Sequence, residues 1–380
     1  SLRFDVGGDG TWGVNFSRRI RRKNEITFWS PIPREFGLAR LTMAGDLVGV
    51  QPGRASRDLR FKPYSLGRTV RGVGGPEFTT SGDFGADIKA GLTRALTLDV
   101  TINPDFAQVE ADEQQVNLTQ FSQFFPEKRE FFLENSGTFY VGDAARSNRA
   151  FAPPTPDEDM LLFFSRRVGI TTAGSPMTIP AGARLTGTIG SLGVGGLAMR
   201  TERTGSTPAS TYSALRVRKN LAPGSDVGLI YMARDAVDST GDYNRAFGAD
   251  ANIRFFRKVD WNSFAVASQT PGKTGGEYTW RTSLNYEGPF VHAKIASLEV
   301  GDGFQDDLAF YRRTGIRKWF ADMGLRPRLA WWTAHGVREL HPHFVWNYYD
   351  DLSGRTVGKS LHTGNTLFFS DGGFTEISAN

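Results

Sequence analysis

The chain has 380 residues, with 45 basic and 40 acidic side chains, a formal net charge of +5, 44 glycines, 29 phenylalanines and no cysteine. The absence of cysteine excludes a disulfide scaffold and a thiolate metal site. Both charges are spread along the whole chain, which argues against nucleic acid as a partner. The basic run from Arg18 to Lys23 is explained more simply by a charged turn or by contact with anionic lipid headgroups.

The hydropathy pattern excludes a helical membrane protein. Mean hydropathy is -0.34, and no stretch approaches the roughly 18 consecutive apolar residues that a spanning helix needs. A transmembrane β-barrel stays open, because only alternate residues of each of its strands face lipid. The chain begins at Ser1 without a signal peptide and ends at Asn380 without the terminal aromatic residue typical of outer-membrane barrels, so we expect truncation at both ends.

Residues 1–103 are expected to supply the first strands of a barrel. Residues 86–92 carry apolar side chains at every second position, with Asp87 and Lys89 between them. Residues 96–103 repeat this pattern. A period of two with one apolar face indicates β-strands.

Residues 104–180 break this rhythm and predict an irregular, partly helical insertion. Asp112 is placed to cap a helix, and apolar residues follow at helical spacing until Pro126 ends the run. A polar, proline-rich stretch lies at 152–159. Backbone of this kind is not tolerated in lipid, so we expect the insertion to fold into the barrel lumen or to cap its periplasmic mouth.

Residues 181–380 read as a train of strands about ten residues long. Residues 247–255 and 278–287 alternate well, whereas 262–268 alternate poorly. Strands of a soluble sandwich or propeller average about five or six residues, and a tilted bilayer span needs about 9–11. Aromatic residues expected near strand ends suit the interfacial girdles of a barrel; they are Trp261, Tyr278, Tyr286, Trp319, Trp331, Tyr348 and Tyr349.

These patterns predict an all-β fold, an antiparallel transmembrane β-barrel that is incomplete in this chain, with a plug-like or cap-like insertion. The first strands (1–103), the insertion (104–180) and the further strands (181–380) are expected to form one structural domain. A soluble all-β protein is the alternative.

Several sequence blocks resemble a known family. Residues 98–112, 116–118 and 124–134, with further blocks at 20–31 and in 164–187, are similar to an uncharacterised family of bacterial envelope proteins. In that family a carbohydrate-binding family 9-like module precedes a large outer-membrane barrel domain, and some members are labelled as membrane-associated hydrolases. The resemblance implies an outer-membrane location, outer-membrane lipids as partners, and glycans or the sugar-binding module as further partners.

Two groups of charged residues in the insertion are candidate plug or lumen residues. Asp105, Glu110 and Asp112 offer oxygen ligands for a hard cation such as Ca²⁺, but their spacing is not that of an EF-hand, and we interpret them as a polar loop inside the barrel. The second group is Glu127, Lys128, Arg129 and Glu134.

Glu127 and Glu134 can be read as paired carboxylates for glycoside hydrolysis, which needs one carboxyl with a raised pKa. The neighbouring Lys128 and Arg129 favour ionised carboxylates. We therefore interpret this group as a salt-bridged segment that holds the insertion against the barrel wall, and we assign no catalytic residue.

His341 and His343 lie two residues apart, so both imidazoles face the same side of a strand. Zn²⁺ accepts such a pair but needs a third ligand, for which His335 is only a guess. We interpret the pair as polar lumen-facing residues and predict no metal and no cofactor.

The predicted function is an outer-membrane channel, transporter or surface-binding component, with carbohydrate as a candidate solute. The alternatives are an envelope-associated glycan hydrolase and a barrel that anchors a sugar-binding module. Mixed charge is expected in the lumen, from the lumen-facing candidates Asp250, Arg254, Arg281, Glu287 and Lys294.

Overall fold

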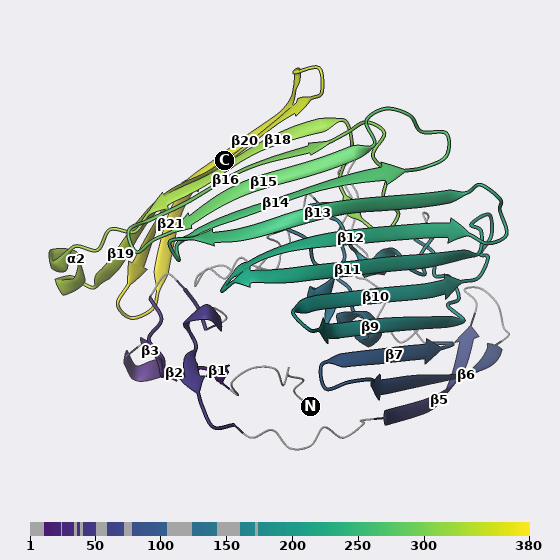
Figure 1. Cartoon of the computed structure of the whole chain (residues 1–380). Helices are drawn as coiled ribbons and strands as arrows, with labels where there is room; N and C mark the ends of the chain where they lie inside the picture. The colour runs from purple at the N-terminus through teal and green to yellow at the C-terminus, as the bar shows by residue number, and fades with distance from the viewer. Residues whose placement is uncertain are drawn as a thin grey trace.

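The computed structural model describes residues 11–23, 25–33, 36–38, 41–50, 59–71, 78–104, 124–142, 160–171 and 174–380. Fifteen of its strands form one sheet in the order β21-β20-β19-β18-β16-β15-β14-β13-β12-β11-β10-β9-β7-β6-β5. Every neighbouring pair is antiparallel. Figure 1 shows these strands side by side across one broad, curved sheet. The predicted all-β, antiparallel fold is confirmed.

The strands of this sheet are β5 Leu59–Arg71, β6 Phe78–Gly91, β7 Leu96–Ile102, β9 Ala181–Ile189, β10 Leu192–Thr201, β11 Ser210–Ala222, β12 Ser225–Ala236, β13 Tyr243–Phe255, β14 Val259–Gln269, β15 Tyr278–Glu287, β16 Val291–Val300, β18 Ile316–Leu325, β19 Val337–Asp351, β20 Thr356–Phe369 and β21 Phe374–Ala379. Most are joined by short turns to the next strand, as the alternating sequence pattern predicts. In the described part of the chain the edge strands β5 and β21 do not pair with each other, so the sheet is open.

Within residues 1–103, the strands described before residue 50 do not belong to the large sheet. Strand β1 (Trp12–Val14) pairs with β4 (Gly45–Leu47), and β2 (Ser17–Ile20) pairs with β3 (Glu25–Phe28), in two separate two-stranded sheets. These strands have three or four residues, too few to cross a bilayer. The basic run begins in β2 with Arg18 and Arg19 and ends in the 3₁₀ helix η1 (Arg21–Lys23) at the turn of the β2–β3 hairpin.

Two parts of the chain outside the large sheet pack on one of its faces, which we call the inner face. The first, the inward segment, comprises the described residues 124–142 and 160–171, with helix α1 (Glu130–Leu133), the 3₁₀ helices η3 (Ser136–Thr138) and η4 (Ser165–Arg167), and strand β8 (Met160–Leu161). The second, the inward loop, is residues 301–311 between β16 and β18; its strand β17 (Phe310–Tyr311) pairs with β8.

One hydrophobic core joins both inward parts to the sheet. Side chains from the sheet include Leu197, Met199, Tyr212, Ala214, Ile230, Met232, Ala246, Phe264, Val266, Leu298, Val300 and Ile316. Side chains from the inward parts include Phe132, Phe139, Met160, Leu162, Val168, Phe304 and Leu308. The inner face of the central strands is therefore a packed interface.

This core explains the poor alternation of residues 262–268. In β14 the inner-face residues Phe264 and Val266 are apolar because they pack on the core, and small residues such as Ala265 alternate with them. Apolar side chains therefore occupy both faces, and the sequence loses its period of two. Among the described residues, no helix is long and apolar enough to cross a membrane; Trp331, expected near a strand end, lies in the short helix α2 (Ala330–Ala334).

Candidate functional site

At strand β7 of the large sheet, the buried face is polar and the exposed face is apolar, the reverse of a strand in a water-soluble protein. In β7 the polar residues Thr97 and Thr101 point to the inner face and are 1% and 0% exposed. Ile102 of the same strand points to the other face, which we call the outer face, and is 48% exposed. Burying hydroxyls while exposing large aliphatic side chains is unfavourable if water contacts the outer face.

The exposed apolar side chains of the outer face continue across the whole sheet. They include Leu215, Val217, Leu229, Phe247, Leu284, Ile295, Trp319, Trp346 and Leu361. Leu229, near the middle of β12, is 62% exposed, and Phe247 of β13 is 56% exposed. A contiguous apolar surface of this extent marks contact with a partner or a membrane.

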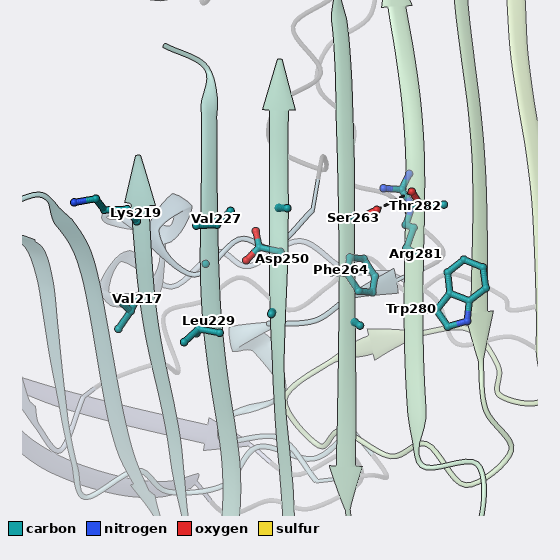
Figure 2. A pocket seen from close by; sticks show the side chains of 14 residues that line it. Val217, Lys219, Val227, Leu229, Asp250, Ser263, Phe264, Trp280, Arg281 and Thr282 are labelled. Carbon is teal, nitrogen blue, oxygen red and sulfur yellow. Dashed lines mark hydrogen bonds between the residues drawn. The ribbon is translucent and has the colours of Figure 1, made fainter. Parts of the chain in front are cut away.

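A shallow hollow in the outer face crosses β11 to β15. Its lining includes Val217, Leu229, Ala249, Ala265 and Trp280, which are successive cross-strand neighbours. The hollow forms because two alanines stand between the large side chains of Leu229 and Trp280. Figure 2 shows the lining residues on these adjacent strands. Its apolar walls suit a hydrocarbon chain rather than a polar ligand.

The inner face carries charged residues that are buried and paired. Arg216 of β11 and Asp250 of β13 form a bidentate ion pair, with Nη1–Oδ1 2.6 Å and Nη2–Oδ2 2.9 Å, and their side chains are 1% and 0% exposed. Asn252 donates to the same carboxylate at 3.0 Å. Arg216 also donates to the backbone oxygen of Tyr140 at 3.4 Å, which ties the inward segment to the sheet.

All five predicted lumen-facing residues lie on the inner face. Besides Asp250, Arg254 pairs with Asp260 at 2.6 Å and Glu287 pairs with Arg326 at 2.6 Å. The other two are Arg281, which is buried, and Lys294, which lies opposite Asp322 of β18. The partners Arg216, Asp260 and Arg326 were missed, because strand register cannot be read from a single strand.

A second charged cluster holds α1 against β6, β7 and β9. Arg184 of β9 pairs with Asp99 of β7 at 2.9 Å and donates short hydrogen bonds to the backbone oxygens of Phe131 and Glu134. Lys89 of β6 forms an ion pair with the Glu134 carboxylate. The predicted residue Glu134 thus lies where the inward segment meets the sheet.

Glu127 and Arg129 stabilise the inward segment internally. The Arg129 guanidinium contacts the Glu127 carboxylate at 2.7 Å and donates to the backbone oxygens of Val168 and Ser165 at 2.7 Å and 2.8 Å. Burial raises the pKa of Glu127, but hydrogen bonds and charge from Arg129 outweigh burial, so the net pKa lies below its ordinary value. Lys128 donates its backbone amide to the same carboxylate at 3.0 Å. The predicted residues Asp105, Glu110 and Asp112 lie outside the described residues.

The inward loop was not predicted from the sequence. Phe304 and Leu308 are 0% and 1% exposed, and Asp307 pairs with Arg234 of β12 at 2.6 Å. Asp306 is 3% exposed, and burial raises the pKa of its carboxyl to about 7. The signal that could have found the loop is the unusually long interval between two clear strands, filled by residues 301–311.

His341 and His343 both lie on the inner face of β19. His335, the third ligand considered for a zinc site, follows helix α2 and contacts the backbone oxygen of Trp331 at 2.7 Å. His341 instead lies 2.9 Å from His292, and His343 lies 3.2 Å from His362, measured between Nε2 atoms.

Comparisons with known proteins identify no activity. An uncharacterised family, "Domain of unknown function (DUF5916)", matches residues 56–186, the stretch from just before β5 into β9. This match contains most of the sequence blocks that carry the envelope-protein resemblance. No curated protein matches the chain.

Three solved Pseudomonas aeruginosa structures are similar in fold. OpdL is 12% identical with a TM-score of 0.38, covering 87% of this chain and 85% of that chain. OccK8 (OprE) is 11% identical with a TM-score of 0.37, covering 81% and 78%. OccK11 (OpdR) is 11% identical with a TM-score of 0.35, covering 82% and 75%. At these values the likeness carries no functional conclusion.

Proposed function

We propose that this chain forms much of the wall of a bacterial outer-membrane β-barrel that acts as a channel or transporter. The observation that carries the proposal is the exposed apolar outer face, which spans β11 to β20 in large side chains such as Leu229, Phe247 and Trp346. In a membrane, lipid chains contact these apolar side chains, whereas in water their exposure would cause aggregation.

Strand length supports the same function. In the large sheet, the strands from β9 to β16 and strand β18 contain between 9 and 13 residues, and β19 and β20 contain 15 and 14. A transmembrane strand tilted by about 45° needs about 9–11 residues. The longer strands extend beyond the hydrocarbon, as external hairpins of barrels do.

The inward segment and the inward loop then act as the plug of the barrel. Both pack on the inner face, where the central strands supply the hydrophobic core and the pairs Arg216–Asp250 and Arg184–Asp99. Toward β19–β21 most inner-face side chains are half-buried or exposed, with Glu339 and Thr366 as buried exceptions. We infer that solutes pass, or dock, along this less covered side.

Membrane fractionation of the full-length protein, followed by gel electrophoresis with and without heating, tests the barrel. Outer-membrane enrichment and a heat-shifted band are expected, because a closed barrel resists detergent until heated. Recovery of a soluble, unshifted protein would overturn the proposal. Conductance in planar bilayers then tests the channel, and silent bilayers together with a heat-shifted band would leave a barrel that anchors another module.

Carbohydrate as the solute remains a proposal, motivated by the sugar-binding module of similar proteins. Liposome swelling measures the rate at which solutes enter. The solutes are a graded series of neutral oligosaccharides and amino acids of similar size. Faster entry of the oligosaccharides than of amino acids of similar size supports it, and equal size-dependent entry of both classes contradicts it.

We also propose that the inward segment is structural and not a hydrolase site. An acid catalyst for glycoside hydrolysis needs a carboxyl that stays protonated near neutral pH, whereas Arg129 keeps Glu127 ionised. Replacing Glu127 and Glu134 with Gln should not change hydrolysis of a glycan panel. Glycan cleavage that is lost in these two variants, while both stay folded, would contradict this.

A further inference from the structure

Four of the five histidines lie close together on the inner face of β16, β19 and β20, and we call them the histidine row: His292, His341, His343 and His362. The ring centroids of His341 and His343 are 4.8 Å apart, and those of His343 and His362 are 5.3 Å apart. His341, His343 and His362 are half-buried, whereas His292 is buried.

Strand register and glycine bring the row together. His343 of β19 pairs across the ladder with Gly324 of β18 on one side and with Gly364 of β20 on the other. A Cβ at Gly364 would lie 2.8 Å from Cε1 of His343 and 3.3 Å from Oε1 of Glu376. The missing side chain therefore leaves the space in which the His343 ring and the Glu376 carboxylate lie.

The hydrogen bonds fix which nitrogen of each ring is free to bind a ligand. Nδ1 of His343 donates to the backbone oxygen of His341 at 3.2 Å, and Nδ1 of His362 donates to Oδ1 of Asn380 at 2.7 Å. A neutral imidazole that donates from Nδ1 presents a lone pair at Nε2. Both free lone pairs are therefore on the Nε2 atoms.

These two lone pairs and one carboxylate face each other. The Nε2 atoms of His343 and His362 are 3.2 Å apart, and Nε2 of His362 is 3.7 Å from Oε1 of Glu376. The ligand atoms of the three residues all lie within 4.8 Å of one another. Two facing lone pairs repel, so the arrangement is stabilised by a positive charge between them, either a proton on one of the two rings or a metal ion.

The spacing of the two Nε2 atoms matches that of two ligands on a tetrahedral metal ion. Zn–N bonds of about 2.0–2.1 Å at tetrahedral angles separate two nitrogens by about 3.3 Å. Two imidazoles and one carboxylate form a ligand set that zinc uses, with the fourth position open. Beyond the ligands, Asn380 orients His362, and Thr366 Oγ1 donates to Oε2 of Glu376 at 3.1 Å, as supporting residues of metal sites do.

We propose that His343, His362 and Glu376 bind a divalent transition-metal ion, zinc by preference, with the fourth position open to water or to a solute in the lumen. His292 and His341 flank the site but belong to a different contact. Their Nε2 atoms are 2.9 Å apart, an ordinary hydrogen-bond distance, and Nδ1 of His292 is 3.6 Å from Oδ1 of Asp322. The proposal stands whether or not the barrel conducts solutes.

Zinc titration of the full chain, purified in detergent and stripped with a chelator, tests the site. Competition against a chromophoric zinc chelator should give one ion per chain. His362→Gln and Glu376→Gln should each weaken binding by at least about 100-fold because they remove a ligand. Asn380→Ala keeps all three ligands and should weaken binding by about 10–100-fold.

His335→Gln, outside the row, is the matched control and should bind zinc like the unchanged chain. Cobalt(II) in place of zinc should give the intense visible absorption of a tetrahedral site, and His343→Gln should abolish it. Unchanged zinc affinity in His343→Gln and His362→Gln, or loss of affinity in His292→Gln alone, would overturn the assignment. Circular dichroism and heat-modifiability confirm that each variant is folded, and the Asn380→Ala result stands if a ligand variant misfolds.

Discussion

The inner face of the sheet differs between the central strands and the strands β19–β21. On β10, β12 and β16, inner-face residues such as Met199, Met232 and Val300 are about 1% exposed, because the inward segment and inward loop cover them. On β19–β21, His343 is half-buried, and Glu376 is exposed. The alternation decides which residues share a face, but the parts packed on that face decide whether it becomes a core or a polar wall.

Charged side chains also differ between the two regions, because the inward parts cover the central strands and not β19–β21. Under the inward segment, charges are fully buried and therefore paired with bidentate geometry, as in Arg216–Asp250. On the less covered side, water and ions can satisfy polar groups, so imidazoles and carboxylates face one another without a permanent protein cation between them.

The largest expected effect comes from breaking the most buried pair. Asp250→Ala leaves the Arg216 guanidinium buried without its carboxylate and should lower the free energy of unfolding by about 3–5 kcal/mol. Urea unfolding in detergent micelles measures the change. The matched control is Asp238→Ala, whose carboxylate pairs with the exposed Arg203 at 2.8 Å and should matter little. Equal losses in the two variants would contradict the contrast between covered and open regions.

An arginine substituted on the outer face distinguishes a face that contacts lipid from one that contacts water. Leu229→Arg, near the middle of β12, should cost about 2–4 kcal/mol in a bilayer, whereas Val227→Arg, near the strand end, should cost about 0–1 kcal/mol. Both side chains belong to the exposed outer face. Reversible unfolding from liposomes gives both values. If neither substitution changes the free energy of unfolding, water rather than lipid contacts this face.

The inward loop should make stability depend on pH. Because burial raises the pKa of Asp306 from 3.8 to about 7, its neutral form favours the folded state. That contribution is complete below about pH 4 and is lost as pH rises to about 7. Asp306→Asn keeps the oxygen that accepts from the Leu308 amide at 2.9 Å, and it should gain roughly 1–3 kcal/mol over the original chain at pH 8 but nothing at pH 4. Melting temperatures of the variant and the original chain at pH 8 and pH 4 measure this difference. An equal gain in stability at both pH values would show that Asp306 does not titrate with a raised pKa.

The smallest expected effect concerns the attachment of the inward segment. Glu134, which is 47% exposed, pairs with Lys89, so Glu134→Gln should cost no more than about 1 kcal/mol. The loosened segment should nevertheless be cleaved faster in limited proteolysis. Glu130→Gln is the control, since its side chain is 93% exposed and only 4.0 Å from Lys62. Identical cleavage rates would show that Glu134 does not hold the segment.

The fold could be predicted from the sequence wherever one face of a strand is polar and the other apolar. Strand β13 alternates cleanly because Asp250 and Arg254 face inward while Phe247 faces outward. Strand β14 could not be predicted, because Phe264 and Val266 are apolar on the inner face under the inward segment. An alternating pattern within one strand does not predict whether a segment distant in sequence will pack on one of its faces.

The candidate sites show the same limit. His341 and His343 were found as a same-face pair, but their partners His292 and His362 lie 49 and 19 residues away in the chain. Only the register of four strands, with Gly324 and Gly364 between the rings, brings them together. His335 is closer in sequence but does not join the row, because it lies at the end of helix α2, where its ring contacts the backbone oxygen of Trp331.

Single cysteines along β19 test the central claim that the outer face contacts lipid and that the less covered inner face at β19 contacts water. The chain has no cysteine of its own, so each label is unique. In liposomes, Phe344→Cys and Trp346→Cys should resist a membrane-impermeant maleimide, while Val345→Cys and Asn347→Cys should react. Spin labels at the same sites should show high oxygen and low nickel-reagent accessibility at 344 and 346, with the reverse at 345 and 347. Uniform reactivity along the strand would contradict the account.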